Sequence, residues 1–248
     1  MVKIERQEFI IKQLNLHNKV LTNELCLKLD VSEDTIRRDL NEMATSNQLL
    51  KVHGGALGKS YFKNRINSDI YSVSQKQIIA KKAVKLIKDD MLILTSGGTT
   101  ICELIRFLPD NLKATFCTIS LMAADELVNH PNIEVIYIGG RISKDSKISV
   151  GGEAIMKIAE MKFDLCLLGT NGIDAKEGLT DSDIEVVQIK KAMRKASRKL
   201  AILTISEKLN SVCRANICQP NEIDCLITEL NPDDELLIDY KKEGIELL

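Results

Sequence analysis

Residues 31–40 decide how the first part of the chain folds, and they read Val31-Ser32-Glu33-Asp34-Thr35-Ile36-Arg37-Arg38-Asp39-Leu40. Ser32 is a favourable N-cap, and the two acidic residues after it suit the positive end of a helix dipole. Val31 can pack on Ile36 as a hydrophobic staple. We therefore predict a helix that begins at Glu33.

The two faces of this helix differ in chemistry. Ile36, Leu40 and Met43 recur at i, i+4 and i+7, so they form the buried face. The residues turned outward by this spacing are Thr35, Arg37, Arg38 and Asn41. Arginine can pair with guanine or phosphate, threonine can contact a phosphate or a thymine methyl, and asparagine can pair with adenine. The outer face is therefore suited to a DNA groove.

The segments on either side predict a winged helix-turn-helix. Apolar spacing predicts one helix over residues 4–14 and a second that Thr22 can cap, while Gln48–Val52 reads as a strand and Gly54-Gly55 as a turn. Two short helices joined by a tight turn and followed by a wing form this motif. Basic residues that would follow the DNA backbone are Lys51, His53, Lys59, Lys63 and Arg65.

Spacing alone leaves alternatives open. An Arg-Arg pair on an amphipathic helix is commonly a solvated face, and Asp34 could pair with Arg38 at i+4. Three-helix units also occur in dimerisation modules. The helical pattern by itself therefore supports DNA binding and dimerisation alike.

Length and composition fit a two-domain globular protein. The chain has 248 residues, of which 44% are hydrophobic and 28% charged. Residues 1–65 hold eleven Lys/Arg against eight Asp/Glu, whereas the whole chain has a net charge of −1. Apolar runs are far shorter than the ~20 residues that span a bilayer, and the first residues alternate charged with apolar side chains. We expect no membrane segment, no signal peptide and a cytoplasmic location.

Cysteine spacing and glycine patterns bear on cofactors. None of the seven cysteines stands at a C-x-x-C spacing, and the cluster at 213, 218 and 225 has no histidine nearby, so buried thiols are favoured over a metal site. A Walker loop and a G-x-G-x-x-G fingerprint are also lacking. We expect no metal and no cofactor, and ATP and NAD are disfavoured.

The rest of the chain alternates short β-rich runs with helical patterns. Strands are predicted at 91–95, 114–118, 133–138, 165–168, 200–204 and 224–228, and helices at 76–87, 100–107, 121–129, 153–160 and 184–198. This alternation predicts a Rossmann-like α/β domain, with a mainly parallel sheet and any ligand at the carboxyl ends of its strands. The domain boundaries that we expect are 3–58 for the DNA-binding domain, 59–73 for a linker, 74–235 for the α/β domain and 236–248 for a C-terminal tail.

The turn after the first of these strands is suited to a phosphate. It reads Ser96-Gly97-Gly98-Thr99-Thr100, in which glycines let backbone N–H groups approach an anion and the following helix adds positive potential. The alternative is a plain strand-to-helix turn. Further polar or glycine-rich corners that could converge on the same ligand contain Gly140, Arg141, Gly152, Asn171, Gly172, Asp174, Lys190 or Lys191, and Lys208. Taken singly, each basic residue among them is more often a surface charge.

The N-terminal part resembles the DeoR family of bacterial transcriptional regulators. The resemblance is carried by residues 31–40 together with Lys51-Val52-His53-Gly54-Gly55-Ala56, in which a lysine stands where the family has arginine. It implies that Thr35, Arg37 and Arg38 face DNA. The DNA-binding residues that we expect are Thr22, Ser32, Thr35, Arg37, Arg38, Asn41, Lys51 and His53.

Residues 75–230 resemble the DeoR-type effector domain, which is similar in fold to ribose-5-phosphate isomerase and the CoA transferases. The resemblance implies that the loops hold a phosphorylated sugar, with its phosphate on the Gly-Thr-Thr turn. The chain departs from the family at Thr95, where an acid is frequent, at Ile119, where asparagine is frequent, and near Ile205, where an aspartate often precedes the lysine. Groups that could bind sugar hydroxyls are therefore fewer.

Together these features predict a transcriptional regulator rather than an enzyme. We expect a homo-oligomeric repressor of sugar-metabolism genes that binds a double-stranded DNA operator and responds to a phosphorylated sugar. One alternative is an isomerase-like enzyme with an accessory DNA head, for which Asp174 or Glu153 could be the base. Another is a regulator whose sensor domain has lost its ligand.

Overall fold

The computed structural model describes residues 2–17, 19–58 and 71–248, and it divides the chain into two compact units after Tyr71. Most of the predicted linker 59–73, with Lys59, Lys63 and Arg65, lies outside the described residues. Helix α4 (Val73–Ala83) already begins inside that predicted span. Among the described residues, no helix is both long and apolar enough to cross a bilayer.

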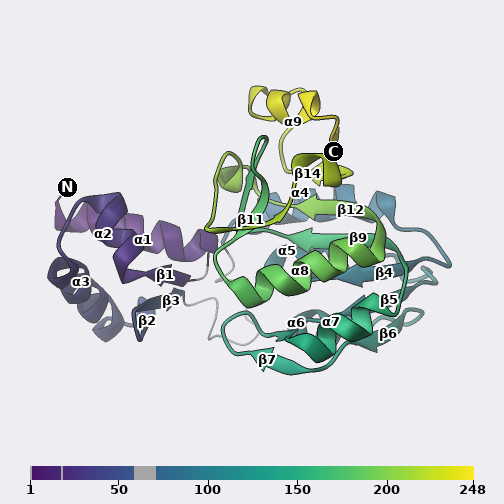
Figure 1. The fold of residues 1–248 in the computed structure, drawn as a ribbon, viewed down its shortest axis with the longest axis horizontal. Helices are drawn as coiled ribbons and strands as arrows, with labels where there is room; N and C mark the ends of the chain where they lie inside the picture. Colours follow the sequence, from purple (N-terminus) through teal and green to yellow (C-terminus); the bar gives the residue numbers. More distant parts are fainter. Residues whose placement is uncertain (1, 18, 59–70) are drawn as a thin grey trace. The chain divides into compact units, whose positions relative to one another are not determined.

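The described residues of the first unit form three helices and a small sheet (Figure 1). Its elements are α1 (Lys3–His17), β1 (Lys19–Leu21), α2 (Thr22–Leu29), α3 (Glu33–Thr45), β2 (Leu49–Val52) and β3 (Gly55–Gly58). Helix α3 begins at Glu33 as predicted, and the Ser32 side chain accepts a hydrogen bond from the Thr35 N–H. Ile36, Leu40 and Met43 are buried in the core of this unit, which confirms the predicted face.

The start of helix α2 differs from the prediction. Thr22 is not its N-cap: Leu21 occupies that position, and no side chain caps the helix. The reason is strand β1, which the sequence pattern did not predict and which leads directly into the helix. The Thr22 N–H donates to the carbonyl of Gly54 over 2.8 Å, so the wing satisfies this helix terminus.

The wing is the hairpin of β2 and β3, and β3 is the middle strand of a three-stranded antiparallel sheet in the order β1-β3-β2. Val20 lies opposite Ala56 in its register. At Gly55 the approach is so close that a Cβ atom would lie 2.0 Å from the Val20 carbonyl oxygen. The glycine at this position is therefore required by the contact between β1 and β3.

The second unit is built on a seven-stranded parallel sheet, in the order β15-β14-β12-β9-β4-β5-β6. Its strands are β4 (Leu92–Thr95), β5 (Thr115–Thr118), β6 (Glu134–Tyr137), β9 (Phe163–Gly169), β12 (Ser197–Leu203), β14 (Cys225–Ile227) and β15 (Glu246–Leu247). The predicted parallel sheet is confirmed. The carboxyl ends of its central strands meet at one edge, which is where the predicted loops begin.

Helices cover both faces of this sheet. Helix α5 (Thr99–Arg106) connects β4 to β5, and α6 (Leu121–Leu127) connects β5 to β6, so the chain moves towards the β6 edge of the sheet. Helix α8 (Ile184–Ala196) connects β9 to β12, so there the chain moves towards the opposite edge. Because such crossovers are right-handed, the two directions place helices on opposite faces. Helix α4 packs on α5, and α7 (Gly152–Ala159) packs on α8.

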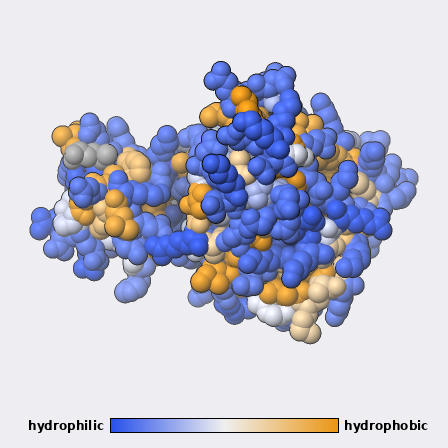
Figure 2. Space-filling view, turned by 45° about the horizontal axis from the view of Figure 1, so that its top comes forward, coloured by the Kyte–Doolittle hydropathy of each residue, from blue (hydrophilic) through white to orange (hydrophobic). Residues whose placement is uncertain are grey.

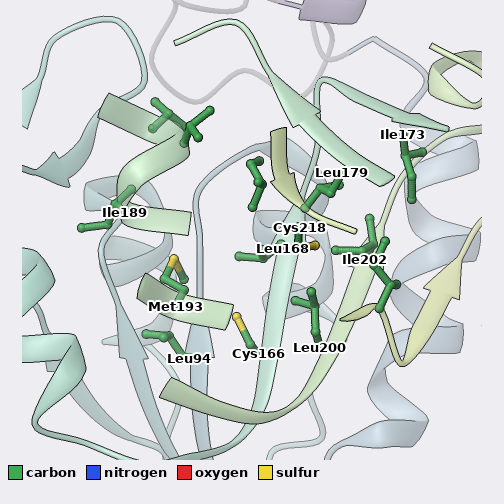
Figure 3. Packing of buried hydrophobic residues seen from close by; sticks show 14 of the residues in the cluster. Leu94, Cys166, Leu168, Ile173, Leu179, Ile189, Met193, Leu200, Ile202 and Cys218 are labelled. Carbon is green, nitrogen blue, oxygen red and sulfur yellow. The ribbon is translucent and has the colours of Figure 1, made fainter. Parts of the chain in front are cut away.

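The main core lies between the sheet and helix α8. Figure 3 shows Ile189 and Met193 of that helix gathered with Cys166, Leu168 and Leu200 of the sheet. Burial of these side chains is the principal stabilising contribution of such a layer. On the surface, Figure 2 shows mostly hydrophilic residues, with hydrophobic ones in small patches.

The described cysteines form no disulfide. Burial raises the pKa of Cys102, Cys166, Cys218 and Cys225 to about 12. Cys26 and Cys213 are only half-buried. No group of three His, Cys, Asp or Glu side chains in the described part of the chain could hold a metal ion.

Short hairpin strands and the last residues differ from the sequence-based expectation. The unpredicted strands are β7 (Arg141–Ser143), β8 (Ile148–Val150), β10 (Gly172–Asp174), β11 (Gly178–Asp181) and β13 (Ala215–Cys218). Where the sequence suggested a tail over 236–248, the structure has helix α9 (Ile238–Lys242) and strand β15, which pairs with β14. Tyr240 is fully buried there, and its hydroxyl donates to the Ile173 carbonyl over 2.9 Å.

Candidate DNA-binding surface and effector site

The outer face of helix α3 is exposed and carries two arginines. Arg37, Arg38 and Asn41 are exposed, whereas Thr35 is half-buried beside the cap. Arg37 pairs with Glu33 over 2.7 Å, and both side chains are about 60% exposed. A pair this exposed adds little stability, so Arg37 can exchange its partner for a phosphate or a base edge.

The wing adds to the same surface. Lys51 and His53 are exposed, and the Lys51 ammonium donates to the Asn41 side-chain oxygen, which places the wing beside helix α3. Ser32 is exposed at the helix start, next to Thr35, with 2.9 Å between the two hydroxyl oxygens. Thr22 differs from the other predicted DNA-binding residues, because it is largely buried at the junction of β1 and α2.

A buried ion pair that the sequence pattern did not single out holds this surface in place. The guanidinium of Arg6 in α1 binds the carboxylate of Asp39 in α3 through two hydrogen bonds. The hydrogen bond to Asp39 raises the pKa of Arg6 above its ordinary value. An acid at an otherwise buried helix position is the only sequence signal for such a pair.

The predicted phosphate loop lies between β4 and α5. Gly98 precedes the helix with φ of +112°, a conformation that favours glycine, and Thr99 and Thr100 form its first turn. Ser96 is buried instead of exposed to a ligand, since its hydroxyl accepts the Gly169 N–H over 3.2 Å. Gly97 is tightly surrounded, because a Cβ there would lie 2.9 Å from the Ile148 side chain. The loop is thus joined to the end of β9 by the hydrogen bond between Ser96 and Gly169.

Three lysines gather beside this loop. Lys190 of α8 donates to the Gly169 carbonyl over 3.1 Å and to the Asp181 carboxylate over 2.9 Å. Lys208, beyond the end of β12, donates to the Thr170 carbonyl over 2.8 Å. Lys76 of α4 is buried, and its charge acts on Lys208. The carboxyl ends of β4, β9 and β12 therefore carry a concentration of positive charge.

The pKa values of Lys208 and Lys76 reflect the surroundings of these two side chains. Burial lowers the pKa of Lys208 to about 7, and repulsion from Lys76 and Lys190 adds to the effect. Burial also lowers the pKa of Lys76 to about 8, against the attraction of Glu103. Asp181 is itself buried, which raises its pKa, but attraction and hydrogen bonding by Lys190 bring it below the ordinary value.

The remaining predicted effector residues divide into two groups. Asn171 joins the cluster, since its amide donates to Asp181 over 3.0 Å. Asp174 instead accepts the N–H groups of Lys176 and Glu177 and so closes the β10–β11 turn. Gly172 serves packing, because a Cβ there would lie 2.8 Å from the Ser211 carbonyl oxygen.

Other predicted residues lie around helices α7 and α8. Arg141 in β7 pairs with exposed Glu185 near the start of α8. Gly140 has φ of +146° and approaches Ala154, while Gly152 begins α7. Arg141 thus forms its ion pair with Glu185 and not with Asp181, the acid that is bound to Lys190 in the lysine cluster.

Lys76 and Asp181 belong to the cluster but were not among the predicted site residues. Lys76 stands in a helix with four other lysines close by in sequence, so it has no distinguishing signal. Asp181 precedes the helix-capping Asp183 and reads as part of a turn. Only the fold brings the two together.

Comparison with known proteins matches both units to one family. The family model for a DeoR-like helix-turn-helix domain matches residues 6–60, and that for a DeoR C terminal sensor domain matches residues 72–230. An HTH-type transcriptional regulator, GolR of Listeria innocua, is 33% identical over 99% of this chain and 98% of its own. The HTH-type transcriptional repressor GlcR of Bacillus subtilis is 29% identical over 100% of this chain and 96% of its own.

A third relative and two solved structures complete the comparison. The glycerol-3-phosphate regulon repressor of Haemophilus influenzae is 29% identical over 96% of this chain and 93% of its own. The tetrameric eIF2B-beta2-delta2 complex from C. thermophilum matches 68% of this chain and 60% of that chain at 12% identity, with a TM-score of 0.50. Ribose 5-phosphate isomerase A from Methanocaldococcus jannaschii matches 54% of this chain and 53% of that chain at 21% identity, with a TM-score of 0.40.

A winged helix-turn-helix whose third helix exposes two arginines, joined in one chain to a sensor domain, defines a DNA-binding transcriptional regulator. The chain belongs to the DeoR family of such regulators. It is a regulator and not an enzyme, in keeping with the names of its relatives.

Proposed function

We propose that the protein is a repressor whose operator affinity falls when a phosphorylated sugar binds at the carboxyl end of its parallel sheet. The observation that carries the proposal is the convergence of Lys190 and Lys208 on the carbonyls of Gly169 and Thr170, next to the Gly98–Thr100 turn. Backbone N–H groups at a helix start, together with buried ammonium groups, form an environment for a phosphate.

The relatives support the same reading. GlcR is named a repressor, and another relative is named for a regulon of glycerol 3-phosphate. A small phosphorylated polyol or sugar is a ligand class that fits the lysine cluster, and the name of the second relative contains such a compound. Relief of repression requires that the ligand bind one state of the protein more tightly than the other, since equal affinity shifts no equilibrium.

The DNA side of the proposal assigns base or phosphate contacts to the exposed residues of α3 and the wing. They are Ser32, Thr35, Arg37, Arg38, Asn41, Lys51 and His53. One recognition helix reads few base pairs, so we propose that two copies bind repeated half-sites as a homo-oligomer. Thr22 would not contact DNA and would instead help to position the wing, through its hydrogen bond to Gly54.

Fluorescence anisotropy with DNA from the region upstream of the protein's own gene tests the DNA side at fixed salt. We expect Arg38→Ala to weaken specific binding by about 1–3 kcal/mol if it contacts a base, and to weaken binding to all sequences alike if it contacts phosphate. Arg198→Ala is the matched control, because that arginine is 77% exposed at the side chain in the other unit. Equal affinity of wild type and Arg38→Ala for every sequence would contradict the assignment.

The same assay tests the sensing side. Glucose 6-phosphate, fructose 6-phosphate and glycerol 3-phosphate are added to the preformed complex, and release of DNA by one of them is the expected result. Lys190→Met should abolish release while operator binding persists. Intact operator binding that no phosphorylated compound alters would show that the sensor domain has lost its ligand.

A further inference from the structure

Two different sets of anion-binding groups lie side by side at the carboxyl end of the sheet. The turn after β4 offers backbone N–H groups and the hydroxyls of Thr99 and Thr100. The segments after β9 and β12 offer the ammonium groups of Lys190 and Lys208. Strand β9 separates β4 from β12, and two strand spacings correspond to about 10 Å between the chain segments that leave β4 and β12.

Lys208 is held toward the middle of this span. Its ammonium group binds the carbonyl of Thr170, the residue that follows β9, while Lys190 occupies the preceding carbonyl of Gly169. The Gly169 N–H in turn binds Ser96 at the base of the β4 turn. The Lys208 ammonium and the β4 turn are therefore both hydrogen-bonded to the segment that ends β9, the strand next to β4.

The charge around Lys208 is unbalanced. The charged or titratable groups that act on it are Lys76 of α4, Lys190 of α8, Asp181 at the end of β11 and Cys213. Repulsion from each of the two lysines exceeds the attraction of Asp181, and burial adds to the cost of a charge there. Asp181 is already bound to Lys190 and to the Asn171 amide. An acidic group supplied by a ligand would offset this excess of positive charge.

From this arrangement we propose that the effector carries two acidic groups: a phosphate at the Gly98–Thr100 turn and a carboxylate or second phosphate against Lys208. This inference rests on the proposed function, which places a phosphorylated sugar at the same edge of the sheet. A sugar bisphosphate or a phosphorylated sugar acid has the required chemistry. A monophosphate would leave only a neutral hydroxyl near Lys208, where Lys76 and Lys190 repel the Lys208 ammonium.

Isothermal titration calorimetry with matched pairs of ligands tests the proposal on the full chain. The pairs are fructose 6-phosphate with fructose 1,6-bisphosphate, and glucose 6-phosphate with 6-phosphogluconate. We expect at least one doubly acidic member to bind about tenfold or more tightly than its partner, as a charge-assisted contact predicts. Lys208→Gln should remove that preference, so that the two members of the pair bind with affinities within about twofold of each other. Lys195→Gln, an exposed lysine of α8, is the control and should keep the preference.

Proton uptake gives a second readout that does not depend on a variant. At pH 8 most Lys208 side chains are neutral, since the pKa is about 7. An acidic group beside Lys208 raises the pKa of this lysine. The protein should therefore take up protons at Lys208 when a doubly acidic ligand binds, and fewer when the matching monophosphate binds. Titrations in two buffers of different ionisation enthalpy measure the difference, because phosphate monoesters are already fully ionised at this pH.

The binding results distinguish an error in this inference from an error in the proposed function. If monophosphates bind and release the operator as well as their doubly acidic partners do, the inference is overturned and the proposed function stands. A preference that survives Lys208→Gln also overturns it. If no phosphorylated compound binds while operator DNA does, the inference and the proposed sensing of a phosphorylated sugar both fail.

Discussion

Arg6 and Asp39 join helix α1 to helix α3 by a buried ion pair. Arg6 Nη2 donates to Asp39 Oδ1 over 3.2 Å, its Nε donates to the other carboxylate oxygen, and the Asp39 side chain is only 3% exposed. Asp39 directly follows Arg37 and Arg38 in the sequence. The pair therefore fixes the rotation of the helix that presents both arginines to solvent.

Asp39→Ala should unfold the first unit more easily, because it leaves a buried guanidinium without its carboxylate. We expect a loss of about 3–5 kcal/mol from the free energy of unfolding. Glu42→Ala is the control: Glu42 pairs with Lys3 on the same two helices, but both side chains are more than half exposed, and such a pair contributes at most about 1 kcal/mol. Scanning calorimetry of the full chain measures both changes. Equal losses in the two variants would contradict the structural role of the buried pair.

Two adjacent glycines in the wing should respond differently to substitution. Gly55→Ala places a Cβ against the Val20 carbonyl oxygen, so strands β1 and β3 must separate, at a cost of about 3 kcal/mol or more. Gly54 has φ of +75° and open space around its Cα, so Gly54→Asn should cost only about 1 kcal/mol. Thermal unfolding followed by circular dichroism compares them. The close contact would be disproved if Gly55→Ala were the milder change.

Lys208 should make the stability of the second unit depend on pH. The unfolded chain keeps this lysine protonated up to its ordinary pKa of 10.5, whereas the folded protein loses the proton near pH 7. Between these values the unfolded state binds more protons, so the free energy of unfolding should rise with pH, by about 2 kcal/mol from pH 7 to 9. Below pH 7 both states are protonated and this contribution stays constant.

Urea denaturation at pH 7, 8 and 9 measures that rise. Lys208→Met should reduce its slope, and the remainder should come from Lys76, whose pKa is about 8. Lys195→Gln changes an exposed lysine of the same unit and should leave the slope as it is. A slope unaffected by Lys208→Met would contradict the lowered pKa.

Thr95 and Thr118 should give effects of opposite sign when each is changed to valine. Thr95 Oγ1 is buried and has no hydrogen-bond partner among the described residues, so Thr95→Val should stabilise the fold by about 1 kcal/mol. Thr118 Oγ1 donates to the Thr95 carbonyl and accepts the Ser120 N–H, so Thr118→Val should destabilise it by about 1–2 kcal/mol. Chemical denaturation compares the two. Destabilisation by Thr95→Val would indicate a partner for its hydroxyl that the structure does not show.

Local patterns sufficed to predict the long elements of this fold. Helix α3 was predictable because its cap, first turn and buried face all agree over residues 32–43, and the strands of the parallel sheet are short apolar runs between helical segments. Strands β1 and β15 were not predictable, because with two or three residues each they have no period and depend on their partners β3 and β14.

The candidate site was predictable only in part for a similar reason. The Gly97–Thr100 turn has its own composition, and Lys190 and Lys208 follow strands or lie on a helix beside them. The position of Lys76 depends on how α4 packs on α5, and that of Asp181 depends on the hairpin that contains β11. Asp174 has a residue type that fits a ligand, but the β10–β11 turn uses its carboxylate.

The burial of most cysteines has a practical consequence. The thiolate is the nucleophile that attacks thiol reagents, so side chains whose pKa is about 12 stay unreactive near neutral pH. Cys26 lies in helix α2 of the DNA-binding unit and Cys213 lies in the sensor unit, and both are only half-buried. With a donor and an acceptor fluorophore attached at these two native cysteines, the efficiency of energy transfer would report changes in the distance between the two units as effector is added.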